Sequence, residues 1–386
     1  MNTTSSLRGT AAIVGVGESD QLGRLPDRSA LQLHMEAARN ALADAGIGVG
    51  EVDAVFSSGR NMANEVPEYL GIRPRFVGGT QVGGCSFLLH IEHAAAALAA
   101  GLCSVALITH GESGYSRVGH PRQRWGDDSV NNQFEIPHGT TGPATGYGLV
   151  ATRHMHEYGT TSEDLAEIAV ATRAWASLNP RAFARDPITI EDVLASRIIS
   201  WPLHLLDCCL VTDGGGAVVL TRAERAADLP APPVFVLGTG TAIGHLMVSQ
   251  MENFDRWDAA ERAGAAAFAM AGVGPTDIDV TQLYDAFTIV PLLALEALGY
   301  CGRGESGPFV RGQRTAPGGA FPLNTNGGGL SYTHTGMYGI FMIIEAVRQL
   351  RGLRGPAQVQ GARTALCHGT GGEWSSAATV ILSLDR

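Results

Sequence analysis

The strongest constraint on the fold of this chain is a segment that occurs twice, with Gly46 and Gly272 as matching positions. Ala45-Gly46-Ile47-Gly48 leads to Glu51-Val52-Asp53, and Ala271-Gly272-Val273-Gly274 leads to Asp277-Ile278-Asp279. In each copy an alanine-rich helical pattern precedes the glycine, and a strand-like run follows the acidic residues. An internal repeat of this length predicts two duplicated α/β halves rather than a solenoid.

The spacing of the two copies predicts an insertion within the first half. After the strand-like Val105–Thr109 the chain becomes rich in Gly, Pro, Arg, Asn and His, and two helices are expected over 141–158 and 162–177, the second with Ser162 as its N-cap. A glycine turn at Asp213 then leads into another buried strand. We therefore expect an N-terminal half over 1–240, which carries an insertion at 115–200, and a C-terminal half over 241–386.

Composition excludes several classes of protein. A content of 45% hydrophobic and 17% charged residues is typical of a globular protein, and a formal charge of −10 without any basic run argues against nucleic acid as a partner. No apolar run approaches the ~18 residues of a membrane span, and no signal peptide pattern is present. The six cysteines form no CxxC pair, so we expect reduced thiols, no metal site and a cytoplasmic location.

The basic residues narrow the chemistry further. All 27 Lys+Arg residues are arginine, which excludes a lysine Schiff base, a lysine-bound pyridoxal cofactor and a Walker A lysine. We expect no tightly bound cofactor. Gly15-Val16-Gly17 resembles part of a dinucleotide fingerprint but lacks its third glycine, and is interpreted as a buried strand.

Cys85 follows the glycine turn Gly83-Gly84 and stands where a helix is expected to begin. The positive end of a helix dipole favours thiolate, the reactive form of the thiol. The alternative is a small buried residue that closes a strand-to-helix turn, because buried cysteines are usually inert.

Four further reactive groups stand at the ends of elements: Tyr284, His334, Cys367 and His368. Ligand sites of open α/β sheets gather at the carboxyl ends of strands, so these groups are expected to converge with Cys85. A thiol beside an imidazole, with an oxyanion hole made of backbone N–H groups, is typical of covalent acyl transfer.

These motifs resemble those of the thiolase superfamily, and within it the sterol-carrier-protein-x and lipid-transfer type. The resemblance rests on the Cys85 turn, Tyr284-Asp285-Ala286-Phe287, Thr333-His334-Thr335-Gly336 and Cys367-His368-Gly369-Thr370-Gly371-Gly372. It implies a five-layer αβαβα fold with a loop-domain insertion, and an acetyl-CoA acetyltransferase-like activity. It also implies a homodimer and a small partner subunit with an OB-fold and a zinc ribbon, the two forming a heterotetramer.

The resemblance also implies roles for the residues. Cys85 is the nucleophile, His334 activates it in place of the family's Gly-His-Pro histidine, and His368, rather than Cys367, is the second acid–base group. Tyr284 stands where the family usually has Asn or His. Relatives that cleave steroid side chains by retro-aldol chemistry also carry a tyrosine there, have a second tyrosine at the position of His334, and use no nucleophilic cysteine.

Three functions follow as alternatives. The main reading is thiolysis of a 3-oxoacyl-CoA by coenzyme A through a Cys85 acyl-enzyme. The second is retro-aldol cleavage of a 3-hydroxyacyl-CoA by Tyr284 or His334. The third is a non-catalytic scaffold or acyl-CoA carrier.

Substrate contacts are expected from two places. The resemblance places CoA against the insertion, where Arg117, Arg122 and Arg124 are candidates for its phosphates, although a solvated loop or a subunit contact explains each equally well. The bulky Phe87 beside Cys85 favours an aromatic or steroid-type acyl chain.

Overall fold

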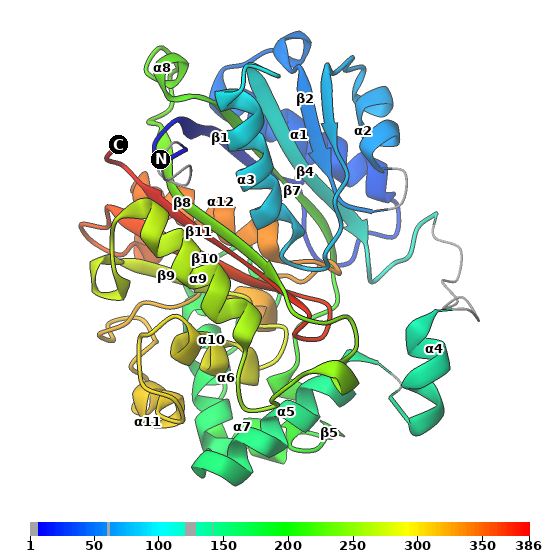
Figure 1. Cartoon of the computed structure of the whole chain (residues 1–386), viewed down its shortest axis with the longest axis vertical. Coiled ribbons are helices and arrows are strands. Elements are labelled where there is room, and N and C mark those ends of the chain that lie inside the picture. The colour runs from blue at the N-terminus through cyan, green and yellow to red at the C-terminus, as the bar shows by residue number, and fades with distance from the viewer. Residues whose placement is uncertain (1–6, 60–61, 120–128, 141) are drawn as a thin grey trace.

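The structure is a computed structural model that describes residues 7–59, 62–119, 129–140 and 142–386 (Figure 1). Its main strands are β1 (Ala11–Glu18), β2 (Ala54–Ser57), β3 (Phe76–Gly78), β4 (Val105–Ser113), β7 (Asp213–Arg222), β8 (Val234–Ile243), β9 (Val280–Leu283), β10 (Thr364–Gly371) and β11 (Ser376–Ser383). Its longer helices are α1 (Ala30–Ala45), α2 (Met62–Leu70), α3 (Ser86–Ala99), α5 (Pro143–Tyr158), α6 (Ser162–Ser177), α9 (Asp258–Ala271), α10 (Ile289–Ala297) and α12 (Gly339–Leu350). Short elements are α4 (Val130–Phe134), α7 (Ile190–Ala195), α8 (Ala223–Ala226), α11 (Ser306–Val310) and the hairpin β5 (Ile198–Ser200) and β6 (Leu203–His204).

The main sheet has mirrored halves. Its strand order is β3-β2-β4-β7-β1-β8-β11-β10-β9, so β1 and β8 meet near the middle and the strands on either side correspond in pairs, except for β3 at one edge. The pairs β2–β4 and β9–β10 are parallel, whereas β4–β7 and β10–β11 are antiparallel. The duplicated α/β halves predicted from the repeat are confirmed.

The helices complete five layers. Helix α1 packs on β1, β4 and β7, and α9 packs on β8 and β11. Helices α3 and α12 contact each other and also strands of both halves, so they form the middle layer between the two half-sheets. Figure 1 shows the two halves with α5, α6 and α7 below them.

The repeated segment has the same structural role in each half. Gly46 ends α1 and Gly272 ends α9, both left-handed, with φ of 68° and 70°, a conformation that favours glycine. The Asp53 carboxylate accepts the N–H groups at the start of β4, and the Asp279 carboxylate accepts those at the start of β10. In each half the repeat therefore ends the first helix with a glycine and binds the start of a parallel strand with an aspartate.

The Gly15-Val16-Gly17 motif packs closely against helix α1, and a similar pair of glycines packs against α9 in the second half. A Cβ on Gly15 would lie 2.2 Å from the Ala41 carbonyl oxygen of α1. In the second half, a Cβ on Gly238 or Gly240 would lie 2.2 or 2.1 Å from a backbone oxygen of α9. These glycines bring each first strand close to its helix, and the motif is the buried strand that we expected.

The two expected helices of the insertion are α5 and α6. The N-cap of α6 is Thr161, not Ser162, because Thr161 forms a reciprocal capping box with Asp164. The expected helix start at Thr141 lies outside the described residues. The boundaries of the two halves and of the insertion stay predictions.

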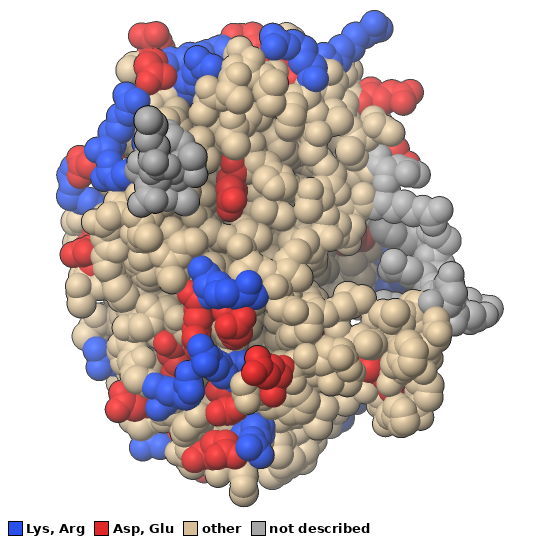
Figure 2. Space-filling view, viewed as in Figure 1, with Lys and Arg blue, Asp and Glu red and all other residues tan. Residues whose placement is uncertain are grey.

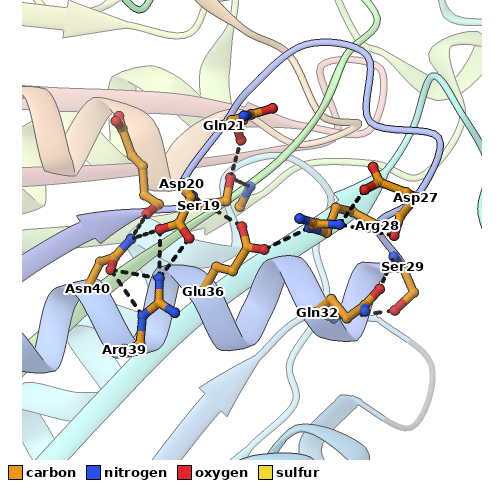
Figure 3. A network of polar contacts seen from close by, with 12 residues as sticks. Ser19, Asp20, Gln21, Asp27, Arg28, Ser29, Gln32, Glu36, Arg39 and Asn40 are labelled. Atoms are coloured by element: carbon orange, nitrogen blue, oxygen red, sulfur yellow. Dashed lines mark hydrogen bonds and ion pairs between the residues drawn. The ribbon is translucent and has the colours of Figure 1, made fainter.

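The loop between β1 and α1 is fastened to α1 by a polar network (Figure 3). Arg39 binds both carboxylate oxygens of Asp20, at 2.7 and 2.8 Å, and Glu36 binds Arg28 at 3.0 Å. The Leu25 N–H, further along this loop, donates to the buried Asp213 carboxylate at 2.7 Å. Asp213 therefore ties the loop to the start of β7.

The surface carries charges of mixed sign. Figure 2 shows acidic and basic side chains interleaved on the lower part of one face. Among the ion pairs, Glu261 contacts both Arg256 and Arg303. Among the described residues, no helix has the length and apolarity that a membrane crossing requires.

Candidate active site

Glycines mark the places where the motif segments meet. A Cβ on Gly83 would lie 2.3 Å from the Gly372 nitrogen, and one on Gly84 would lie 2.5 Å from the Tyr284 ring. A Cβ on Gly339, at the start of α12, would lie 2.6 Å from the Gly84 oxygen. No side chain larger than hydrogen fits these approaches, so the Cys85 turn, the Tyr284 motif and the Gly371-Gly372 turn form one site.

Cys85 is the N-cap of α3 and is fully buried. Its Sγ lies 3.5 Å from Ser376 Oγ and 3.8 Å from the Val82 carbonyl oxygen. Burial raises the pKa of the thiol to about 11, and the hydrogen bond with Ser376 offsets only part of that. Burial therefore favours the neutral thiol over the expected thiolate, and the sulfur's hydrogen-bond partners are a hydroxyl and a carbonyl rather than an imidazole.

Tyr284 and His334 form a hydrogen-bonded pair at the edge of the site. The Tyr284 hydroxyl lies 3.0 Å from His334 Nε2 and accepts the Tyr338 backbone N–H at 2.9 Å. Because that N–H already donates to the phenol oxygen, we assign the phenol proton to the bond with Nε2. Tyr284 is 4% exposed and His334 is partly exposed, so solvent reaches the pair from the His334 side.

Burial keeps both members of this pair neutral. It raises the pKa of Tyr284 well above 10, and it lowers the pKa of His334 to about 4. The pair is therefore a neutral phenol hydrogen-bonded to a neutral imidazole.

The neighbouring Asp285 is structural. It is fully buried, and its carboxylate accepts the Gly329 N–H at 2.6 Å and the Leu330 N–H at 3.3 Å. Burial raises its pKa to about 7, with those two hydrogen bonds opposing the rise. Asp285 holds the turn of residues 328–332 that leads into His334.

His368 and Cys367 lie in the middle of β10, because the strand continues to Gly371 instead of ending in a turn at Gly369. Successive residues of a strand face opposite sides. Gly369 faces Cys85, and Cys367 Sγ faces the same middle layer, 3.4 Å from the Met342 oxygen of α12, where burial raises its pKa.

His368 faces the outer layer. Its Nδ1 lies 2.7 Å from Thr379 Oγ1, and its ring packs 5.1 Å from that of Trp257 at the start of α9. Burial lowers its pKa to about 3. The structure directs this imidazole away from Cys85, contrary to the role expected of it.

Two residues that the sequence analysis missed also border the site. The Tyr147 hydroxyl of α5 donates to the Gly372 oxygen at 2.9 Å, and its ring stacks 4.5 Å from Phe287. The Cys209 N–H donates to the Ala286 oxygen at 2.9 Å. No motif signals either residue: Tyr147 comes from α5 of the insertion, and Cys209 from the segment between β6 and β7.

Of the three candidate arginines, one is described. Arg117 is exposed, with its N–H on the Ser113 oxygen at 2.8 Å and a φ of 55°. Arg122 and Arg124 lie outside the described residues.

Fold and site together define a thiolase-fold protein whose site holds a hydrogen-bonded phenol and imidazole. Residues 240–384 match the family model "Thiolase C-terminal domain-like". The chain belongs to the thiolase superfamily, as an SCP2-thiolase-like protein.

Relatives along nearly the whole chain are enzymes. The chain is 39% identical over 362 residues to the 17-hydroxy-3-oxo-4-pregnene-20-carboxyl-CoA lyase of Mycobacterium tuberculosis, covering 90% of this chain and 92% of the lyase. It is 33% identical over 382 residues to the acetyl-CoA acetyltransferase of Methanothermobacter thermautotrophicus, covering 96% and 99%. The solved Ltp2-ChsH2(DUF35) aldolase superposes with a TM-score of 0.90 at 34% identity, covering 98% and 99%.

Proposed function

We propose that this chain is an aldolase that cleaves the C2–C3 bond of a 3-hydroxyacyl-CoA, with Tyr284 and His334 as its acid–base pair. The observation that carries the proposal is the hydrogen bond of 3.0 Å between these two neutral groups. The similarity to a lyase and to an aldolase favours this alternative over the Cys85 acyl-enzyme, which was the main reading of the sequence. The buried thiol, with its raised pKa, also supports it.

The pair moves one proton at the start of the reaction. The hydroxyl of the substrate gives its proton to the Tyr284 oxygen while the phenol proton passes to His334 Nε2. The electron pair left on the substrate oxygen forms a carbonyl at C3, and the pair of the C2–C3 bond moves to C2 as a thioester enolate. Return of the proton to C2 gives a shorter acyl-CoA and a ketone or aldehyde, so nothing is oxidised or reduced.

The substrate is proposed to carry a bulky ring system at C3. The related lyase is named for a 17-hydroxy, 20-carboxyl-CoA steroid, in which the hydroxyl is β to the thioester. CoA enters this reaction as part of the substrate rather than as a co-substrate. Arg117 stays a candidate for its phosphates.

A small DUF35-type partner subunit is part of the proposal. The aldolase structure that this chain resembles over its full length is named as a complex with such a partner. A homodimer, and a heterotetramer with that partner, stay predictions.

The test is cleavage of a ring-bearing 3-hydroxyacyl-CoA without free CoA, by the chain alone and co-expressed with a DUF35 partner, with the shorter acyl-CoA measured by mass spectrometry. Retro-aldol cleavage proceeds without free CoA and survives Cys85→Ala, whereas thiolysis needs both CoA and the thiol. A requirement for free CoA, or an acyl group trapped on Cys85, would refute the proposal.

A further inference from the structure

The segment that carries His334 is held on both sides by hydroxyl groups. Thr333 and Thr335 flank His334, and both are fully buried. The corresponding family motif has glycine and proline around its histidine, so neither hydroxyl belongs to the motif itself. Each one finds a partner on a different element of the N-terminal half.

Thr212 holds the backbone of His334 from one side. Its N–H donates to the His334 oxygen at 3.0 Å, and its Oγ1 accepts the His334 N–H at 2.9 Å. Its Oγ1 also shares a hydrogen bond of 2.8 Å with Thr333 Oγ1, in which either hydroxyl can be the donor. One fully buried residue, placed directly before β7, thus fixes both peptide groups around His334.

His110 holds the other side. It lies in β4, is 1% exposed, and places Nε2 2.8 Å from Thr335 Oγ1. The His110 ring is itself packed against Phe87 at 4.9 Å and Phe341 at 6.3 Å, which fixes its direction. Neither His110 nor Thr212 is recorded in contact with the Tyr284 hydroxyl, so both act on the pair only through the His334 segment.

We propose that Thr212 and His110 are positioning residues that clamp the Thr333-His334-Thr335 segment and hold His334 Nε2 at the Tyr284 hydroxyl. This inference rests on the proposed function, because it assigns the clamp to the acid–base pair of that reaction. The clamp also explains why threonines surround the histidine in this chain. A backbone fastened by hydroxyls to β4 and to the start of β7 needs no proline to fix it.

The test compares Thr212→Val, which removes the hydroxyl at nearly constant shape, with Thr212→Ser, which restores it. Thr239→Val in β8 is the matched control, because Thr239 is 3% exposed and its hydroxyl, among the described residues, hydrogen-bonds only to Met270 Sδ at 3.8 Å. We expect Thr212→Val to lower kcat about 10- to 100-fold with KM changed less than about twofold, since a displacement near 1 Å costs up to about 100-fold. Thr212→Ser should recover most of the loss, and Thr239→Val should lose none.

A second measurement does not depend on activity. Long-range proton–nitrogen spectra of the 12 ¹⁵N-labelled histidines, with His334 assigned by its loss in His334→Gln, report the hydrogen bond at Nε2. Thr212→Val and His110→Gln should shift or broaden this signal, and Thr239→Val should not. An unchanged signal in both clamp variants would overturn the clamp, whether or not they fold less stably. If the clamp variants change this signal but the wild-type protein cleaves no 3-hydroxyacyl-CoA, the clamp is supported and the proposed function is refuted instead.

Discussion

Tyr284→Phe is the most direct test of the proposed chemistry. The change keeps the ring that packs against Gly84 and removes only the hydroxyl, with its contacts to His334 Nε2 at 3.0 Å and to the Tyr338 N–H at 2.9 Å. Loss of a positioned acid–base group lowers kcat by about 10²- to 10⁴-fold. The Tyr338 N–H is left buried without its acceptor, which costs about 1–3 kcal/mol of the free energy of unfolding.

The assay separates these two effects. The kcat for release of the shorter acyl-CoA and the melting temperature are measured for wild type, Tyr284→Phe and the control Tyr300→Phe. The partly buried Tyr300 hydroxyl accepts a hydrogen bond from Thr281 Oγ1 at 3.3 Å, away from the site. We expect both variants to lose a little stability and only Tyr284→Phe to lose activity. Because Tyr284 and His334 act as one unit, His334→Gln added to Tyr284→Phe should cost little more. A Tyr284→Phe enzyme with more than about a tenth of the wild-type kcat would refute the pair as the acid–base group.

Three further outcomes follow from the structure. Alkylation of Cys85 by iodoacetamide should be slow at pH 7 and accelerate towards the thiol pKa of about 11, and fast alkylation at neutral pH would contradict its buried state. Gly84→Ala should abolish activity and lower the melting temperature, because the new Cβ would lie 2.5 Å from the Tyr284 ring; unchanged kinetics would show that the turn is looser than described. Glu18 is buried, which raises its pKa, but Arg348 and Arg181 outweigh burial and the net pKa is lowered below 4.5. Glu18→Gln should therefore cost about 3–5 kcal/mol at pH 7, and the difference in unfolding free energy from wild type should shrink as the pH falls below 4.5; a difference that is constant with pH would refute the ion pairs.

The sequence alone does not decide between thiolysis and retro-aldol cleavage, because the same motif residues serve both reactions. Cys85, Tyr284 and His334 all stand at motif positions, and spacing along the chain does not report which of them hydrogen-bond. The structure pairs the phenol with the imidazole and leaves the thiol with Ser376 and Val82. Only the tertiary structure therefore shows that His334 is hydrogen-bonded to Tyr284 rather than to Cys85.

The sequence by itself determined the duplicated halves and the site's location. The repeat around Gly46 and Gly272 is local, because a left-handed C-cap and an acidic strand anchor depend on a few neighbouring residues. Gly83 and Gly84 likewise predict a turn from the sequence alone.

Only the tertiary structure decided the roles of His368, Tyr147 and Thr212. The sequence predicts His368 at the end of a strand, before a glycine-rich turn, but pairing with β11 extends β10 to Gly371, and strand alternation directs the imidazole to the outer layer. Tyr147 and Thr212 reach the site from segments more than 100 residues away from its C-terminal motifs in the chain, through bonds to Gly372 and His334. Side-chain direction and long-range hydrogen bonds depend on which strands pair and how helices pack, and the residues next to each group in the chain do not encode them.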